Sequence, residues 1–162
     1  MRLDDVKRIT VIGGGVMGHG IAMTCARAGY RTTVVDIKQE LLDNTKNLIE
    51  NGPFGLRKQV EKGKMTAEQA QGILGNLNYT TYLAAAVGDV QFVIEAVTEN
   101  VGVKAKVFAN VEESAPGDAI LASNTSGIMI TELSRSLKRK DRMVGMHWFS
   151  PAQVMKLIEV VP

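Results

Sequence analysis

The most constraining feature of the sequence is a run of glycines that follows a short apolar segment near the N-terminus. Residues 13–18 read GGGVMG, which has the form G-x-G-x-x-G. The β-branched residues before it, 6–12, predict a strand, and the small apolar residues after it, 16–28, predict a helix. Residues 31–35 (RTTVV) predict a second strand. This order of strand, turn, helix and strand predicts a βαβ unit.

In this context the glycines predict a turn that binds a dinucleotide. Gly13 permits the tight turn, Gly15 lets the backbone approach a pyrophosphate, and Gly18 lets helix and strand pack closely. The start of the helix offers unpaired N–H groups and a partial positive charge to the phosphates. The alternative is a glycine turn without a ligand. The expected cofactor contacts at this turn are Gly13, Gly14, Gly15, Val16, Met17 and Gly18.

An acidic residue ends the second predicted strand. Asp36 lies eighteen residues after Gly18. Its carboxylate is placed to accept hydrogen bonds from the adenosine ribose hydroxyls, and it would repel a 2′-phosphate. We therefore expect NAD rather than NADP as the cofactor.

Segments typical of strands and helices alternate along the rest of the chain. The predicted strands are continuous apolar runs, which is typical of a parallel sheet covered on both faces. We expect an α/β fold of the Rossmann type, with a doubly wound, mainly parallel sheet and helices on both faces. A protruding helical pair is expected near residues 38–75, interrupted at residues 52–55 (GPFG). Further strands are expected at residues 77–80, 90–96, 119–122, 143–146 and 156–161, and further helices at 39–50, 56–62, 66–73, 103–113 and 130–136.

Composition excludes several classes of protein. The 162 residues suit one domain, and 45% hydrophobic with 22% charged residues argues against disorder. A net charge of +2 argues against nucleic acid or a membrane as the main partner. One cysteine rules out a disulfide framework and a zinc cluster of cysteines, and we expect no metal site. Because no apolar stretch spans a bilayer and no signal peptide precedes the first strand, we expect a cytoplasmic protein.

Two polar residues interrupt the apolar C-terminal segments. His147 follows the predicted strand 143–146, at the strand end where open α/β sheets bind ligands. Glu159 interrupts an apolar strand, where a lone carboxylate is costly to bury unless it is paired. A carboxylate orients an imidazole and stabilises its protonated form, as a general base requires. The alternative is that the two residues are unrelated. The second histidine, His19, is expected on the helix surface or near the phosphates.

Hydroxyl-bearing and charged residues follow two other predicted strands. Residues 123–126 (SNTS) either cap the next helix or line the cofactor crevice. Glu95 and Glu99 flank the end of the strand at 90–96, and Lys104 follows on the next helix. These charges are compatible with helix capping or with a surface ion pair.

Four segments together resemble a known family. They read VIGGGVMGHGIA, VIEAVTENVGVK, ASNTSGIMIT and GMHWFSPAQVMKLIEVV. They resemble the NAD-binding domain of 3-hydroxyacyl-CoA dehydrogenases, including the bacterial 3-hydroxybutyryl-CoA enzymes, over nearly the whole chain. The resemblance implies NAD-dependent oxidation of an (S)-3-hydroxyacyl-CoA to a 3-oxoacyl-CoA, or the reverse reaction.

The resemblance also implies roles for individual residues. The catalytic histidine of the family falls on His147, which takes the proton of the 3-hydroxyl while hydride leaves C3 for the nicotinamide. The paired glutamate falls on Glu159 and holds the imidazole. The active-site serine falls on Ser126, which hydrogen-bonds the reacting oxygen of the substrate and helps to seat the nicotinamide. The ribose-binding acid and the other cofactor contacts fall on Asp36, Glu99 and Lys104.

The chain departs from the family pattern at three places. HWFSP replaces the usual HFFNP, so that Ser150 stands where an asparagine lies near the cofactor. SNTSG replaces SNTSS, with Gly127 in the last position. In the helical arm that meets CoA, Gly52-Pro53 and Gln59 stand where many relatives have a hydroxyl and a lysine. Lys58 is the nearest cation that could contact the substrate.

Family members normally continue into a helical C-terminal domain that covers the substrate and contributes to a dimer interface. We therefore expect residues 1–162 to correspond to the NAD-binding domain, without the helical domain of the family. The resemblance therefore implies an acyl-CoA substrate, a helical domain supplied in cis or in trans, and a possible homo-oligomer. We expect weak or no turnover from this chain by itself.

Two other functions stay open. The first is an NAD-binding module without turnover, with a regulatory or structural role; a buried pair of His147 and Glu159 would argue against it. The second is a dehydrogenase of a related two-domain family that acts on hydroxy acids without CoA. The SNTS and HWFSP segments disfavour it.

Overall fold

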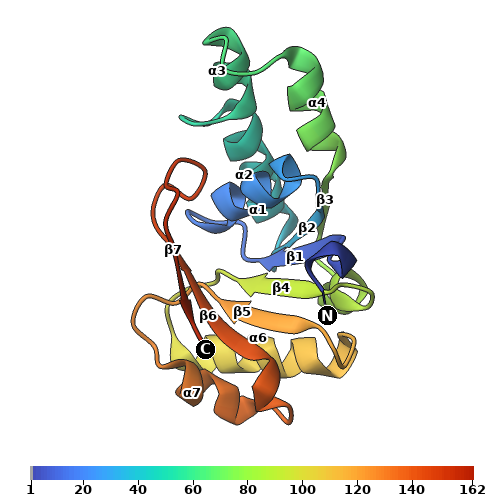
Figure 1. Cartoon of the computed structure of the whole chain (residues 1–162), viewed down its shortest axis with the longest axis vertical. Coiled ribbons are helices and arrows are strands. Elements are labelled where there is room, and N and C mark those ends of the chain that lie inside the picture. The colour runs from blue at the N-terminus through green and yellow to red at the C-terminus, as the bar shows by residue number, and fades with distance from the viewer. Residues whose placement is uncertain (1) are drawn as a thin grey trace.

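The computed structural model describes residues 2–162 and shows the predicted doubly wound α/β fold (Figure 1). Within these residues, seven strands form one sheet in the order β3-β2-β1-β4-β5-β6-β7. Strands β1 to β6 are parallel to their neighbours, and β7 pairs antiparallel with β6. The strands are β1 (Arg8–Ile12), β2 (Arg31–Val35), β3 (Leu77–Thr80), β4 (Phe92–Glu95), β5 (Ile120–Ser123), β6 (Met143–Trp148) and β7 (Ile158–Val161).

The strand order creates a switch point between β1 and β4. From β1 the chain moves outward through β2 to β3, then crosses back to β4 and moves outward in the opposite direction. The connections after β1 and after β4 therefore diverge, and in open α/β sheets ligands bind in the resulting crevice at the carboxyl ends of the strands.

Helices cover both faces of the sheet and enclose two apolar cores. Helices α1 to α4 pack in one core and α5 to α7 in the other. Within residues 2–162, no helix combines the length and the apolar character needed to cross a membrane. The helices are α1 (Gly18–Arg27), α2 (Gln39–Asn51), α3 (Leu56–Glu61), α4 (Ala67–Gly75), α5 (Leu83–Val87), α6 (Val101–Ser114) and α7 (Ile130–Leu133), and the short 3₁₀ turns are Leu3–Asp5, Ser134–Ser136 and Lys140–Arg142.

The predicted helical pair protrudes from one end of the molecule, with α2 and α3 as one limb and α4 as the other (Figure 1). Helix α2 ends where predicted, with Gly52 as its C-cap, because the following Pro53 disfavours the helical conformation at Gly52. A Cβ on Gly52 would lie 2.4 Å from the carbonyl oxygen of Leu48, so a side chain has no room there. Helix α4 begins with a capping box, in which the Thr66 side chain accepts a hydrogen bond from the backbone N–H of Gln69 at 3.2 Å.

Several predicted elements have bounds shifted by one to three residues, and two of the differences change the description of the fold. Helix α5, an alanine-rich turn on the crossover between β3 and β4, was not predicted. Strand β6 continues to Trp148, so that His147 lies within the strand instead of following it. The extension arises because β7 folds back against β6 and continues the ladder as far as the pair Trp148–Ile158.

Candidate active site

The glycine turn joins β1 to α1 in a conformation that its glycines make possible. Gly13 has φ +92°, and a Cβ there would lie 2.8 Å from the carbonyl oxygen of Ala96. A Cβ on Gly18 would lie 1.7 Å from the carbonyl oxygen of Gly13, so this residue has no room for a side chain. By contrast, a Cβ on Gly15 would meet no atom within 4 Å. The turn thus leaves open space where a pyrophosphate would approach the backbone.

Asp36 lies directly beside this turn, at the end of β2. Its Oδ2 accepts a hydrogen bond from the N–H of Gly14 at 2.8 Å, and its Oδ1 accepts one from the N–H of Ile37 at 2.7 Å. These bonds fix the carboxylate while each oxygen keeps a second acceptor site. The open glycine turn and the adjacent carboxylate therefore fit a dinucleotide.

A cleft of about 490 Å³ runs from this turn along the carboxyl ends of the central strands. It brings together residues from all four segments that carry the family resemblance. Among its lining residues are Gly15, Glu99, Lys104, Ser126, His147 and Ser150. Val16 and Met17 also line the cleft, whereas Lys58 is exposed on α3 in the protruding arm, outside the residues that line it.

His147 and Glu159 face each other across neighbouring strands. The antiparallel register of β6 and β7 pairs the two residues, and Nδ1 of His147 lies 3.3 Å from Oε2 of Glu159. The imidazole also contacts the ring of Phe149, with 4.7 Å between centroids. The expectation of a buried pair is wrong for Glu159, whose side chain is 62% exposed against 24% for His147. The reason is that β7 lies at the edge of the sheet.

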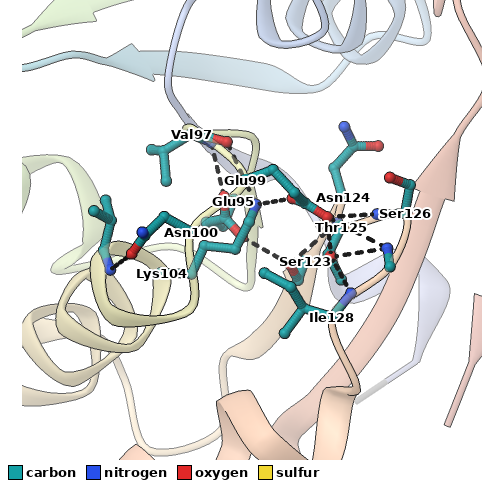
Figure 2. Close-up of polar contacts among 12 residues, drawn as sticks. Glu95, Val97, Glu99, Asn100, Lys104, Ser123, Asn124, Thr125, Ser126 and Ile128 are labelled. Atoms are coloured by element: carbon teal, nitrogen blue, oxygen red, sulfur yellow. Dashed lines mark hydrogen bonds and ion pairs between the residues drawn. The ribbon is translucent and has the colours of Figure 1, made fainter.

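Lys104 is the centre of a buried polar cluster at the carboxyl end of β4 (Figure 2). Its Nζ lies 2.7 Å from Oε1 of Glu95, 3.1 Å from Oε2 of Glu99 and 3.4 Å from the carbonyl oxygen of Val97. The side chain of Lys104 is 1% exposed and that of Glu95 is 0% exposed. The expectation of a surface ion pair or a helix cap is therefore wrong for these two residues.

Glu99 ties this cluster to the SNTS loop (Figure 2). Its Oε1 accepts hydrogen bonds from the Thr125 hydroxyl, from the N–H of Ser126 at 3.1 Å and from the N–H of Gly127 at 3.3 Å. Burial raises the pKa of the Glu99 carboxyl, but the Thr125 hydroxyl, the Lys104 ammonium and the Ser126 amide outweigh it, and the pKa is lowered overall. The backbone of Ser126 is thus anchored while the residue lines the cleft.

The sequence analysis did not predict the contacts that Glu95, Ser123 and Asn124 make in this region. Glu95 and Ser123 are register neighbours at the ends of β4 and β5, and the Ser123 hydroxyl donates to Oε2 of Glu95 at 2.7 Å. Asn124 accepts a hydrogen bond from the backbone N–H of Trp148 at 2.9 Å, which joins the SNTS loop to the strand that carries His147. These contacts could have been predicted, because the carboxyl ends of neighbouring parallel strands lie at the same edge of the sheet and bring their last side chains together.

Comparison with known proteins agrees with this geometry. Residues 8–162 match the family described as 3-hydroxyacyl-CoA dehydrogenase, NAD binding domain. The chain belongs to this family. The cofactor of the family domain is NAD, as predicted from the glycine turn and Asp36.

Several relatives are dehydrogenases or larger fatty acid oxidation proteins. The chain is 38% identical to the mitochondrial hydroxyacyl-coenzyme A dehydrogenase of Sus scrofa, over 96% of this chain and 50% of that protein. It is 44% identical to the fatty acid oxidation complex subunit alpha of Idiomarina loihiensis, over 97% of this chain and 21% of that protein. The crystal structure of 3-hydroxybutyryl-CoA dehydrogenase from Escherichia coli K12 superimposes with a TM-score of 0.91 at 38% identity, over 96% of this chain and 32% of that one. The chain spans half or less of the length of these three relatives.

We predict that Asp36 sets the choice of cofactor. The wild-type protein should bind NAD(H) well and NADP(H) poorly, because a 2′-phosphate would lie against the carboxylate. Asp36→Ala should reduce the difference in affinity between NAD(H) and NADP(H). We expect the affinity for NAD to fall by about tenfold, because hydrogen bonds to a charged group are lost. Calorimetric titration of both cofactors measures this effect, with Asp36→Asn as the variant that keeps the shape of the side chain. Equal affinities of the wild-type protein for the two cofactors would contradict the assignment.

Proposed function

We propose that residues 1–162 form the cofactor-binding and catalytic domain of an NAD-dependent 3-hydroxyacyl-CoA dehydrogenase. The reaction is oxidation of an (S)-3-hydroxyacyl-CoA to a 3-oxoacyl-CoA, or its reverse. The observation that carries the proposal is the cleft beside the glycine turn, in which Ser126 and His147 lie together with Gly15, Glu99, Lys104 and Ser150. Glu159 lies outside the lining of the cleft and contacts His147 at 3.3 Å.

His147 acts as the general base on the substrate. Its Nε2 accepts the proton of the 3-hydroxyl as the C3–O bond becomes a carbonyl. Glu159, 3.3 Å from Nδ1, orients the ring and stabilises the positive charge that the imidazole gains. The Ser126 hydroxyl donates a hydrogen bond to the reacting oxygen. Acceptance of the hydride from C3 is the chemistry that bound NAD supplies.

The remaining residues hold the cofactor and the substrate. The glycine turn and Asp36 bind the pyrophosphate and the adenosine ribose, and Glu99, Lys104 and Ser150 line the part of the cleft that receives the other half of the dinucleotide. The role of Lys58 as the cation that contacts CoA stays a prediction. Lys58 is exposed on the protruding arm, which is compatible with a contact to a phosphate of a large ligand.

The proposal includes a partner for this domain. We propose that a helical domain, in cis or in trans, covers the acyl-CoA substrate, and the greater length of the relatives supports this view. Assembly into a homo-oligomer is compatible with this arrangement of two domains. The cytoplasmic location, and the absence of nucleic acid and membrane partners, stay predictions.

We predict that the 162-residue protein binds NAD but turns over acetoacetyl-CoA very slowly. We expect binding because the glycine turn and Asp36 both lie within this chain, whereas the substrate would remain open to water and poorly positioned. The measurement is acetoacetyl-CoA-dependent oxidation of NADH, with and without a separately expressed helical domain from a relative.

The controls separate the possible outcomes of this assay. His147→Ala in the same mixture should remove the gain that the helical domain provides. Rapid turnover by a verified 162-residue monomer would show that the helical domain is dispensable. If the mixture binds NAD and shows no turnover, the alternative of an NAD-binding module without activity is supported instead.

A further inference from the structure

The buried cluster at the end of β4 holds more negative than positive charge. One ammonium, that of Lys104, is shared between the carboxylates of Glu95 and Glu99 at 2.7 Å and 3.1 Å. Lys104 and Glu99 alone would form a neutral pair. Because a second carboxylate shares the same ammonium, the three side chains together carry one net negative charge, and Glu95 is the carboxylate with no exposed surface.

The position of Glu95 is fixed by three donors. Its Oε1 accepts from Lys104 Nζ and from the N–H of Val97, both at 2.7 Å, and its Oε2 accepts from the Ser123 hydroxyl at 2.7 Å. The side chain has no exposed surface, so solvent ions screen its charge much less than they screen a charge at the surface.

This charge lies beside the reactive half of the cleft. With the pyrophosphate at the glycine turn and the adenosine at Asp36, as proposed, the rest of the dinucleotide would occupy the cleft at the ends of β4, β5 and β6. Glu99 and Lys104 line that part of the cleft, together with Ser126 and His147. The nicotinamide ring that arrives there carries a positive charge when it is oxidised and none when it is reduced.

We infer that Glu95 is a positioning residue that, through Lys104 and Glu99, makes the cleft bind oxidised NAD in preference to the reduced form. The inference rests on the proposed binding mode of NAD in this cleft. Glu95 itself is not expected to touch the cofactor. Its effect is electrostatic, and it differs between the two redox forms because only one of them is charged.

The test is the ratio of two dissociation constants, measured by calorimetry on the 162-residue protein. Glu95→Gln keeps the shape of the side chain and removes the surplus charge. The ratio of Kd for NAD⁺ to Kd for NADH should rise by about tenfold, because the loss of one buried negative charge beside the cleft weakens the binding of the charged ring alone. A tenfold rise corresponds to an increase of about 30 mV in the reduction potential of the bound two-electron couple.

Two controls separate charge from structure. Ser123→Ala removes a hydrogen bond to Glu95 without changing any charge, so it should change both affinities together and leave the ratio unaltered. Glu113→Gln removes an exposed carboxylate from the last turn of α6, the helix that carries Lys104, and should also leave the ratio unaltered. If circular dichroism shows that Glu95→Gln does not fold, Glu99→Gln removes a charge from the half-exposed member of the same cluster and should raise the ratio.

The outcomes distinguish this inference from the proposed function. If the wild-type protein binds both forms and the charge-removing variant leaves the ratio unchanged, the inference is overturned, even if both affinities fall. If the wild-type protein binds neither form of NAD, the proposed function fails instead. A raised ratio in the charge-removing variant, with an unchanged ratio in Ser123→Ala and Glu113→Gln, supports the role of the buried charge.

Discussion

Replacing His147 by alanine should lower kcat by roughly 10²-fold or more in an assembly that contains the helical domain, because the base that accepts the hydroxyl proton is lost. Glu159→Gln should lower kcat by roughly 10²-fold, since the charge that stabilises the imidazolium is removed while the shape is kept. The affinity for NAD should barely change in either variant. Steady-state kinetics with acetoacetyl-CoA and calorimetry with NAD measure the two effects.

The double variant tests whether the two residues act as one unit. His147→Ala combined with Glu159→Gln should be little slower than His147→Ala alone, because losses within a catalytic unit are not additive. Glu113→Gln provides a matched removal of an exposed carboxylate far from the cleft and should leave kcat unchanged. If the losses from the two single variants multiply, His147 and Glu159 act independently and the pair does not work as proposed.

Lys104→Met should destabilise the fold by about 3–5 kcal/mol, because it leaves the fully buried carboxylate of Glu95 without its counter-ion. Urea denaturation followed by circular dichroism gives the free energy of unfolding. Combining Lys104→Met with Glu95→Gln should recover part of the loss, since the unpaired charge is then removed.

The matched control for Lys104 is a cation in an exposed ion pair. Arg57 lies 3.3 Å from Glu61 on the surface of α3, and Arg57→Met should cost less than about 1 kcal/mol. Similar losses for Lys104→Met and Arg57→Met would mean that the burial of the Glu95–Lys104 pair has no energetic consequence.

Much of the fold was predictable because its signals are local. The glycines stand between a predicted strand and a predicted helix, and this context indicated a tight strand-to-helix turn. The continuous apolar strands indicated a sheet covered on both faces. The interruption of the arm at Gly52 was also predictable, because glycine followed by proline weakens a helix at that position. Helix α5 was missed, because a short alanine-rich turn has little periodicity to recognise.

The environment of the charged residues was not predictable from local sequence. Lys104 lies in the first turn of α6, where its ammonium is 2.7 Å from Glu95 at the end of β4. The sequence places the two residues nine positions apart, but it does not reveal that packing encloses both of them. Glu159 is exposed because β7 lies at the edge of the sheet, and its place at that edge depends on the pairing of β7 with β6. In both cases the decisive quantity is burial, which depends on tertiary packing.

Trp148 gives the protein a built-in optical probe of its own cleft. It is the one tryptophan in the sequence, it is buried, and it lies next to His147 in the wall of the cleft. Indole emission overlaps the near-ultraviolet absorption band of the reduced nicotinamide, which the oxidised ring lacks. Energy transfer from this single fluorophore should therefore report NADH binding, and distinguish it from NAD⁺ binding, without any attached label.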